Sequence, residues 1–224
     1  MKTWADHIYS FYKNLQPPQQ LPNQIEWLQP YQNDEVLQVL EKFCHKFYND
    51  VQPRTLLLGI NPGRHGAGIT GINFTAARQL SADCGISHPF KNTSELSAEF
   101  MYEMIEAYGG PTKFYGKFFM GAVCPLGFVQ EGKNLNYYDD KELLQRVEPF
   151  ITENLSNLIS FSVNTQHCIC IGGEKNFRVL NSLNQKEHWF QSIIPLPHPR
   201  FIMQYKRREK QKYIDMYLAA LCAS

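Results

Sequence analysis

The order of apolar and polar positions divides the chain into two helical stretches followed by alternating strand-like and helix-like segments. Apolar residues recur at helical spacing over residues 4–15 and again over residues 34–48. From residue 55 onward, short apolar runs are separated by amphipathic stretches. This alternation is typical of a parallel sheet with helices on both faces.

Four apolar runs are expected to form the sheet, at residues 55–60, 117–123, 166–171 and 191–196. Helices are expected at residues 75–83, 94–107, 139–161, 174–182 and 206–221. We therefore predict an α/β fold with a central, mostly parallel sheet of about four strands, flanked by helices.

The length of 224 residues fits one domain. We expect residues 1–224 to form a single domain, with residues 1–50 as an amino-terminal helical cover and residues 55–221 as the functional core. No apolar run reaches the roughly 20 residues of a membrane helix, and the first residues do not resemble a signal peptide. These observations predict a cytoplasmic monomer that does not enter a membrane.

The six cysteines include no C-x-x-C pair, and a chain of this size folds without disulfides. Cys168 and Cys170 alternate within an expected strand, so both thiols point to one face and pack as small apolar groups. We expect reduced cysteines and no zinc or iron–sulfur site.

Basic residues gather near the carboxyl end. Residues 206–212 hold five basic and one acidic side chain, a local charge of +4, which leaves −3 on the rest of a chain whose net charge is +1. Such a block favours binding of a polyanion. The alternative interpretation is a solvated helix face.

A glycine-rich loop follows the first core strand, where ligands of parallel sheets bind. Asn61 lies at the end of the strand, and Pro62 restricts the turn. Residues 66–71 match the dinucleotide fingerprint G-x-G-x-x-G, but seven residues separate Gly59 from Ala67, and residues 70–74 do not continue as a helix. We expect no nucleotide cofactor.

A histidine follows the last core strand. His198 stands between Pro197 and Pro199, which narrow its backbone freedom and suit a side chain that must aim at a ligand. A lone histidine is usually an ordinary surface or core residue, and that interpretation is the alternative.

These two loops resemble those of a known family. Gly59-Ile60-Asn61-Pro62-Gly63, with Thr70-Gly71 and Phe74, resembles the first active-site motif of the uracil-DNA glycosylase superfamily. His198, followed by proline and Arg200, resembles the second motif of the single-strand-selective monofunctional branch, and Cys124-Pro125-Leu126 is a third similarity. The chain looks most like a bacterial second branch of that family.

The resemblance implies a role for each matching residue. Asn61 would hold the hydrolytic water, Phe74 would stack on the flipped base, and His198 would hydrogen-bond the oxyanion that develops at O2 of the base. Further contacts to the base are expected from Ile60, Pro62, Gly63, Ala67 and Ala122. Many relatives carry an asparagine at the position of Ala122, so a range wider than uracil is expected. No metal and no cofactor is implied.

The resemblance also implies DNA, single- or double-stranded, as the partner. Arg200, Phe201, Ile202 or Met203 would wedge into the space that the base vacates. Phosphates would be bound by Lys206, Arg207 and Arg208. In a bacterium, such a protein would be associated with the nucleoid.

We thus predict a monofunctional DNA repair glycosylase of base excision repair, which flips out uracil or another deaminated base and leaves an abasic site. Three alternatives remain. One is a mismatch-specific uracil/thymine glycosylase, whose branch shares the first motif but lacks the histidine. Another is a non-catalytic DNA-binding module of the same fold. The third, a hydrolase that uses Cys124 and His198, is disfavoured because Pro125 follows the thiol where a helix normally lowers its pKa.

Overall fold

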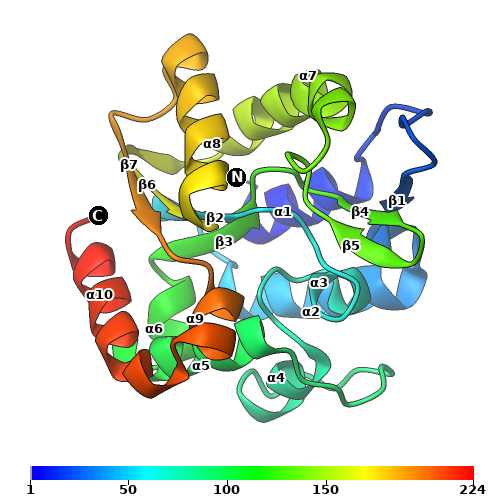
Figure 1. Cartoon of the computed structure of the whole chain (residues 1–224). Helices are drawn as coiled ribbons and strands as arrows, with labels where there is room; N and C mark the ends of the chain where they lie inside the picture. Colours follow the sequence, from blue (N-terminus) through cyan, green and yellow to red (C-terminus); the bar gives the residue numbers. More distant parts are fainter. Residues whose placement is uncertain (1) are drawn as a thin grey trace.

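A computed structural model describes residues 2–224. Its centre is a parallel sheet in the order β3-β2-β6-β7 (Figure 1). The strands are β2 (Arg54–Gly59), β3 (Phe118–Ala122), β6 (Val163–Ile171) and β7 (Ser192–Leu196). Leu56, Leu57 and Leu58 are fully buried, as expected for a strand covered on both faces. The predicted α/β fold with four central strands is confirmed.

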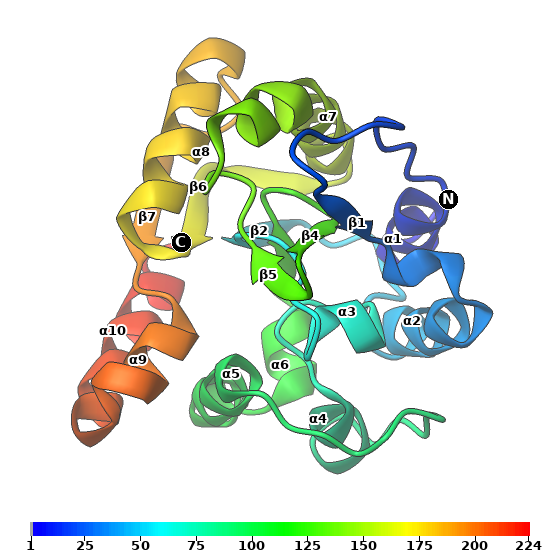
Figure 2. The same ribbon diagram turned by 45° about the vertical axis from the view of Figure 1, so that its right-hand side comes forward.

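Helices cover both faces of this sheet. α7 (Lys141–Ile159) and α8 (Gly173–Glu187) lie on one face, and α5 (Leu96–Tyr108) and α6 (Pro111–Tyr115) lie on the other (Figures 1 and 2). The remaining helices are α1 (Trp4–Lys13), η1 (Pro30–Gln32), α2 (Asp34–Phe47), α3 (Ala67–Thr70), α4 (Ala77–Ala82), α9 (Pro199–Tyr205), η2 (Arg207–Glu209) and α10 (Lys210–Cys222). None of the helices within residues 2–224 is long and apolar enough to cross a membrane.

A small antiparallel sheet, which the sequence analysis did not predict, lies beside the main one. It contains β1 (Glu26–Leu28), β4 (Gly127–Gln130) and β5 (Lys133–Leu135), in the order β1-β4-β5. Glu131 and Gly132 join β4 to β5 with φ of 48° and 72°, the left-handed pair of a two-residue hairpin turn.

The continuous helix predicted over residues 206–221 is wrong at its start. The chain forms α9 before this segment, and the amide of Lys206 donates to Ile202 O and ends that helix. A short 3₁₀ turn then redirects the chain into α10. His198 as the N-cap and Pro199 at the first helical position start α9 earlier than the basic residues suggest.

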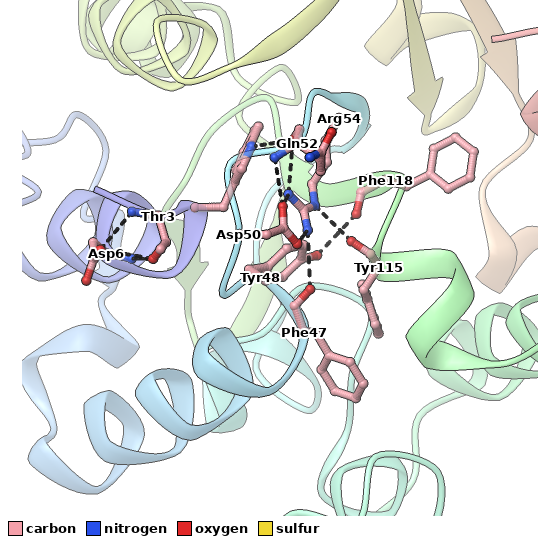
Figure 3. A network of polar contacts seen from close by, with 10 residues as sticks. Thr3, Asp6, Phe47, Tyr48, Asp50, Gln52, Arg54, Tyr115 and Phe118 are labelled. Carbon is pink, nitrogen blue, oxygen red and sulfur yellow. Dashed lines mark hydrogen bonds and ion pairs between the residues drawn. The ribbon is translucent and has the colours of Figure 1, made fainter. Parts of the chain in front are cut away.

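A buried arginine connects the amino-terminal helices to the sheet (Figure 3). Arg54 is fully buried at the start of β2, and its two terminal nitrogens each donate to an Asp50 carboxylate oxygen at 2.8 Å. Its Nε donates to Tyr115 O at 2.8 Å. The guanidinium lies 5.4 Å from the ring centre of Trp4, whose indole N–H donates to Gln52 O. The first helix therefore packs against the Arg54 guanidinium, whose charge is fully hydrogen-bonded.

The strand order also determines where a ligand binds. The chain leaves β2 toward β3, on one side, and leaves β6 toward β7, on the other. Loops that leave adjacent strands in opposite directions open a crevice beyond the carboxyl ends of those strands. The glycine-rich loop after β2 and Gly172 after β6 both border this crevice.

Candidate active site

A cavity of about 460 Å³ lies beyond the carboxyl ends of the parallel strands. Asn61 reaches it from the loop after β2, and His198 reaches it from the loop after β7. These two residues are 137 positions apart (198 − 61), yet they line the same cavity, together with Phe74. The structure therefore brings these three predicted residues together at one cavity.

The amide of Asn61 is held by backbone on both of its polar atoms. Its Nδ2 donates to Leu135 O at 3.2 Å, and its Oδ1 accepts from the Tyr137 N–H at 3.1 Å. This pairing determines which end of the amide is the oxygen. Because a carbonyl oxygen has two lone pairs, Oδ1 retains one acceptor site for a water.

The unpredicted β4–β5 hairpin supplies this support. Asn134 Oδ1 accepts from the Arg64 N–H at 3.0 Å and fixes the same loop further along. Gly127 packs directly against Pro62 O, where a Cβ would overlap. The hairpin thus positions the loop that carries Asn61. The turn-forming glycine of the dipeptide Glu131-Gly132 is the sequence signal for this hairpin.

A buried asparagine supports the hairpin from the opposite side. Asn176 Oδ1 accepts from the Tyr137 hydroxyl at 2.7 Å, and Asn176 Nδ2 donates to Gly59 O at 3.3 Å. Tyr137 therefore connects the end of β2, through Asn176, to the backbone amide that orients Asn61. Both Tyr137 and Asn176 are fully buried.

Phe74 occupies a strained backbone conformation beside the cavity. Its φ is +55°, the left-handed region that bulky residues rarely adopt. Thr70 Oγ1 donates to Thr75 O at 2.7 Å, and Thr75 Oγ1 donates to the carbonyl before Phe74 at 3.2 Å. A Cβ on Gly59 would lie 2.7 Å from the Phe74 ring. Strain of roughly 1–3 kcal/mol at a cavity wall persists only where neighbours impose it, and such positions cluster at functional sites.

His198 is fixed by the turn on which it lies. Its Nδ1 accepts from the Arg200 N–H at 3.1 Å, and the Tyr217 hydroxyl donates to Pro197 O at 2.5 Å. The ring centre of His198 is 6.0 Å from that of Phe74. Since Nδ1 accepts a hydrogen bond, the proton of the neutral ring is on Nε2.

The charge state of His198 follows from its surroundings. Burial, with a smaller contribution from the nearby Arg200 guanidinium, lowers the pKa of His198 from 6.5 to about 4. The imidazole is therefore neutral near pH 7, with one N–H to donate.

All residues predicted to contact a base line the cavity. They are Ile60, Pro62, Gly63, Ala67, Phe74 and Ala122. Ala122, at the end of β3, presents only a methyl group. Polar cavity residues that the sequence analysis did not predict as contacts are His65, Asn73, Glu95, Ser97, Asn134, Asn136, Tyr138, Gln204 and Tyr205. They come from loops and from α5, β5 and α9, far apart in sequence.

The prediction that residues of α9 insert into DNA is wrong for two of them. Ile202 is fully buried and Met203 is 3% exposed, because both face the core, so neither reaches DNA. Arg200 and Phe201 border the cavity, so they remain candidates for the wedge. Tyr205, which was not predicted, is 72% exposed and packs on Phe201 with ring centres 5.6 Å apart. An exposed aromatic pair therefore stands at the cavity mouth.

The basic block is partly neutralised by its own neighbours. Glu209 pairs with Lys206 at 3.4 Å and with Lys212 at 3.9 Å. Lys210 pairs with Glu103 of α5. Among the ion pairs of residues 2–224, none involves Arg200, Arg207 or Arg208. Within the segment from Arg200 to Lys212, these three arginines are therefore the basic side chains free to bind phosphates.

Cys124 does not meet the needs of a nucleophile. It is fully buried, burial raises the pKa of its thiol to about 12, and it is not among the residues that line the cavity. The Cys/His hydrolase alternative is therefore wrong. Cys168 and Cys170 are buried free thiols, as predicted. Within residues 2–224, no cluster of three or more His, Cys, Asp or Glu side chains is arranged to hold a metal ion.

Comparisons with known proteins show which family the chain resembles. The family model of the uracil DNA glycosylase superfamily matches residues 45–222. The crystal structure of wild-type Pedobacter heparinus SMUG2 is 43% identical in sequence and aligns with a TM-score of 0.96, covering 100% of this chain and 98% of that one. A search of curated proteins finds no match.

Proposed function

The chain belongs to the uracil DNA glycosylase superfamily, and on that basis we propose that it is a monofunctional DNA glycosylase acting on uracil and other deaminated bases. The observation that carries the proposal is the convergence of Asn61, Phe74 and His198 on one cavity. Together they supply a water-binding amide, a stacking ring and a hydrogen-bond donor for a departing base.

Access to the sugar carbon C1′ requires that the nucleotide leave the base stack. The 460 Å³ cavity has room for a base with its sugar. Phe74 would stack on the flipped base and contribute about 1–3 kcal/mol. The constraints on the Phe74 backbone keep the ring in place before the base arrives.

His198 would stabilise the departing base. As the N-glycosidic bond lengthens, negative charge develops on the base oxygen O2, and the neutral Nε2–H donates a hydrogen bond to it. A neutral imidazole stabilises the anion without transferring its proton. Because the ring is oriented in advance, the interaction costs little reorganisation in the transition state.

Asn61 would orient the attacking water. Its free Oδ1 lone pair accepts one hydrogen of the water, which turns a lone pair of the water oxygen toward C1′. An amide is too weak a base to deprotonate the water before bond cleavage. The mechanism is therefore largely dissociative, with water captured by a sugar that already carries positive charge.

The absence of an amine supports a monofunctional reaction. Cleavage of the DNA strand by a glycosylase proceeds through a Schiff base with an amine of the protein. None of the cavity-lining side chains in the described chain is a lysine. The product would then be an intact strand with an abasic site.

DNA would lie across the mouth of the cavity. Arg207 and Arg208 are exposed and would bind phosphates, and Arg200 lines the cavity itself. The aromatic pair of Phe201 and Tyr205 would enter the gap that the flipped nucleotide leaves.

The test is base release from oligonucleotides that carry uracil, hypoxanthine or xanthine, followed by alkali to cleave abasic sites. Wild-type protein should release at least one of these bases. Asn61→Ala and His198→Ala should each slow release by roughly 10²–10³-fold while DNA binding is retained. Asn154→Ala is the control, because this half-buried asparagine on α7 is outside the cavity. Binding without release of any deaminated base would instead support a non-catalytic DNA-binding module.

A further inference from the structure

One buried polar side chain of the cavity has no role in the proposed reaction. Asn73, the neighbour of Phe74, is 6% exposed and lines the cavity beside the stacking ring. A buried amide without hydrogen-bond partners is costly, so its contacts indicate its purpose.

The amide of Asn73 has a partner at one end only. Its Nδ2 donates to the hydroxyl of Tyr12 at 3.2 Å, and within residues 2–224 this is the only hydrogen bond of its side chain. Its Oδ1 therefore has no partner within the protein. The amide presents a hydrogen-bond acceptor to whatever fills the cavity.

Tyr12 is itself firmly positioned. It is buried on α1, its ring stacks on that of Tyr31 at 4.4 Å, and the Tyr31 hydroxyl donates to Gly71 O at 2.9 Å. On the other side, the Asn73 carbonyl accepts from Thr75 Oγ1. Side chain and backbone of Asn73 are thus both fixed before a ligand binds.

Deaminated bases share the group that such an acceptor recognises. Uracil at N3, and hypoxanthine and xanthine at N1, present an N–H next to a carbonyl. Cytosine and adenine carry a lone pair at the corresponding ring nitrogen, which would face Oδ1 unfavourably. Ala122, which also lines the cavity, has no polar side-chain atom, so recognition of this edge by a side chain requires another residue.

We propose that Asn73 is a specificity-determining residue, whose Oδ1 accepts the lactam N–H of the flipped base, and that Tyr12 is the positioning residue that orients its amide. The inference rests on the proposed glycosylase function. It assigns the amino-terminal helix, which lies outside the segment matched by the family model, a part in base selection.

The experiment compares single-turnover release of uracil and of 3-methyluracil, which lacks the N–H, by wild type, Asn73→Ala and Tyr12→Phe. Wild type should prefer uracil, because 3-methyluracil leaves Oδ1 unpaired. Asn73→Ala should slow uracil release by about 10- to 100-fold and reduce the preference by about tenfold or more. Tyr12→Phe should reduce the preference by about 3- to 10-fold, since the amide loses its only partner.

Two control variants separate this role from general damage. Tyr9→Phe removes a hydroxyl from the same helix, and Asn154→Ala removes a half-buried amide elsewhere. Both should keep the wild-type preference. If Asn73→Ala does not fold, the uracil preference is measured on Tyr12→Phe and on Asn73→Leu, because leucine has a shape similar to that of asparagine.

The outcomes are distinguishable. An unchanged uracil preference in folded Asn73 and Tyr12 variants, with an active wild type, would overturn this inference alone. A wild type that releases no deaminated base would overturn the proposed function itself.

Discussion

The backbone N–H of Arg200 donates to Nδ1 of His198 at 3.1 Å, so the first turn of α9 fixes the tautomer of the histidine at the cavity. The same turn places the Arg200 side chain close enough to contribute to the low pKa of His198. One short segment therefore determines the orientation, the proton position and the charge of this side chain.

The titration of His198 should reflect this environment. Since its pKa is about 4, the ring stays neutral above about pH 5, and the rate of base release should show no inflection near 6.5 from this residue. NMR of the ring protons, assigned with His198→Gln, measures the midpoint directly. A midpoint near 6.5 would contradict the neutral-donor role.

The same shift predicts a pH-dependent free energy of unfolding. The unfolded chain binds a proton at His198 near pH 6.5, whereas the native chain does so only near 4. The contribution of His198 is therefore fully present above 6.5 and is lost as the pH falls toward 4. Urea unfolding of His198→Gln should show a smaller loss of stability than wild type over this window. Parallel curves for the two proteins would contradict the prediction.

Gly59 and Phe74 should be energetically coupled. A Cβ at position 59 would lie 2.7 Å from the Phe74 ring, so Gly59→Ala should displace the ring and slow base release. In a Phe74→Leu background the methyl group added by Gly59→Ala has more space, so the substitution should destabilise the protein less. A double-mutant cycle on the free energy of unfolding should give a coupling of about 0.5–3 kcal/mol. Strict additivity would show that the ring does not occupy this space.

The salt dependence of DNA binding should single out the unpaired arginines. Arg207→Ala combined with Arg208→Ala should reduce the slope of log affinity against log salt by about 1.8, or 0.9 for each phosphate contact. Lys186→Ala, which removes a cation already paired with Glu148, is the matched control and should leave the slope unchanged. Equal effects of the two variants would argue against a DNA contact at α9 and η2.

Arg54 should be among the most important side chains for stability. Arg54→Ala would leave Asp50 unpaired and would remove the hydrogen bonds that Arg54 donates to Tyr115 O, Gln52 O and Phe47 O. The expected loss is about 3–5 kcal/mol in the free energy of unfolding, from the cavity and the lost hydrogen bonds rather than from Asp50, whose side chain is 43% exposed. Arg178→Ala, which breaks an exposed helical pair with Glu174, should cost less than about 0.5 kcal/mol. Similar losses in both variants would refute the importance of burial.

The core strands were predictable because burial on both faces demands continuous apolar residues. Leu56 to Leu58 in β2 and the alternating Cys and Ile residues of β6 are runs of this kind. Asn61 and His198 could be predicted as site residues because each follows the end of a strand, and Phe74 because it falls in the same motif as Asn61. The strand order then brings those ends to one crevice.

Other parts of the site could hardly be predicted from the sequence. β4 and β5 are four and three residues long, too short for periodicity to reveal. The contact between Tyr12 and Asn73 spans 61 positions, and Tyr12 appears in the sequence as an ordinary core residue of a helix. Ile202 and Met203 were wrongly predicted to contact DNA. Which side of a short helix faces the core is decided by packing, and no local sequence pattern specifies it.

The guanidinium of Arg54 has a consequence for how far this enzyme can be shortened. The superfamily segment begins at residue 45, after α1 and most of α2, yet Trp4 covers the guanidinium and Tyr12 holds Asn73. In an enzyme truncated at this boundary, water would reach the Arg54 guanidinium, which is buried in the native chain. The truncated enzyme would lose cooperative melting and base discrimination together. Engineering of a smaller glycosylase from this chain must therefore retain the first helix.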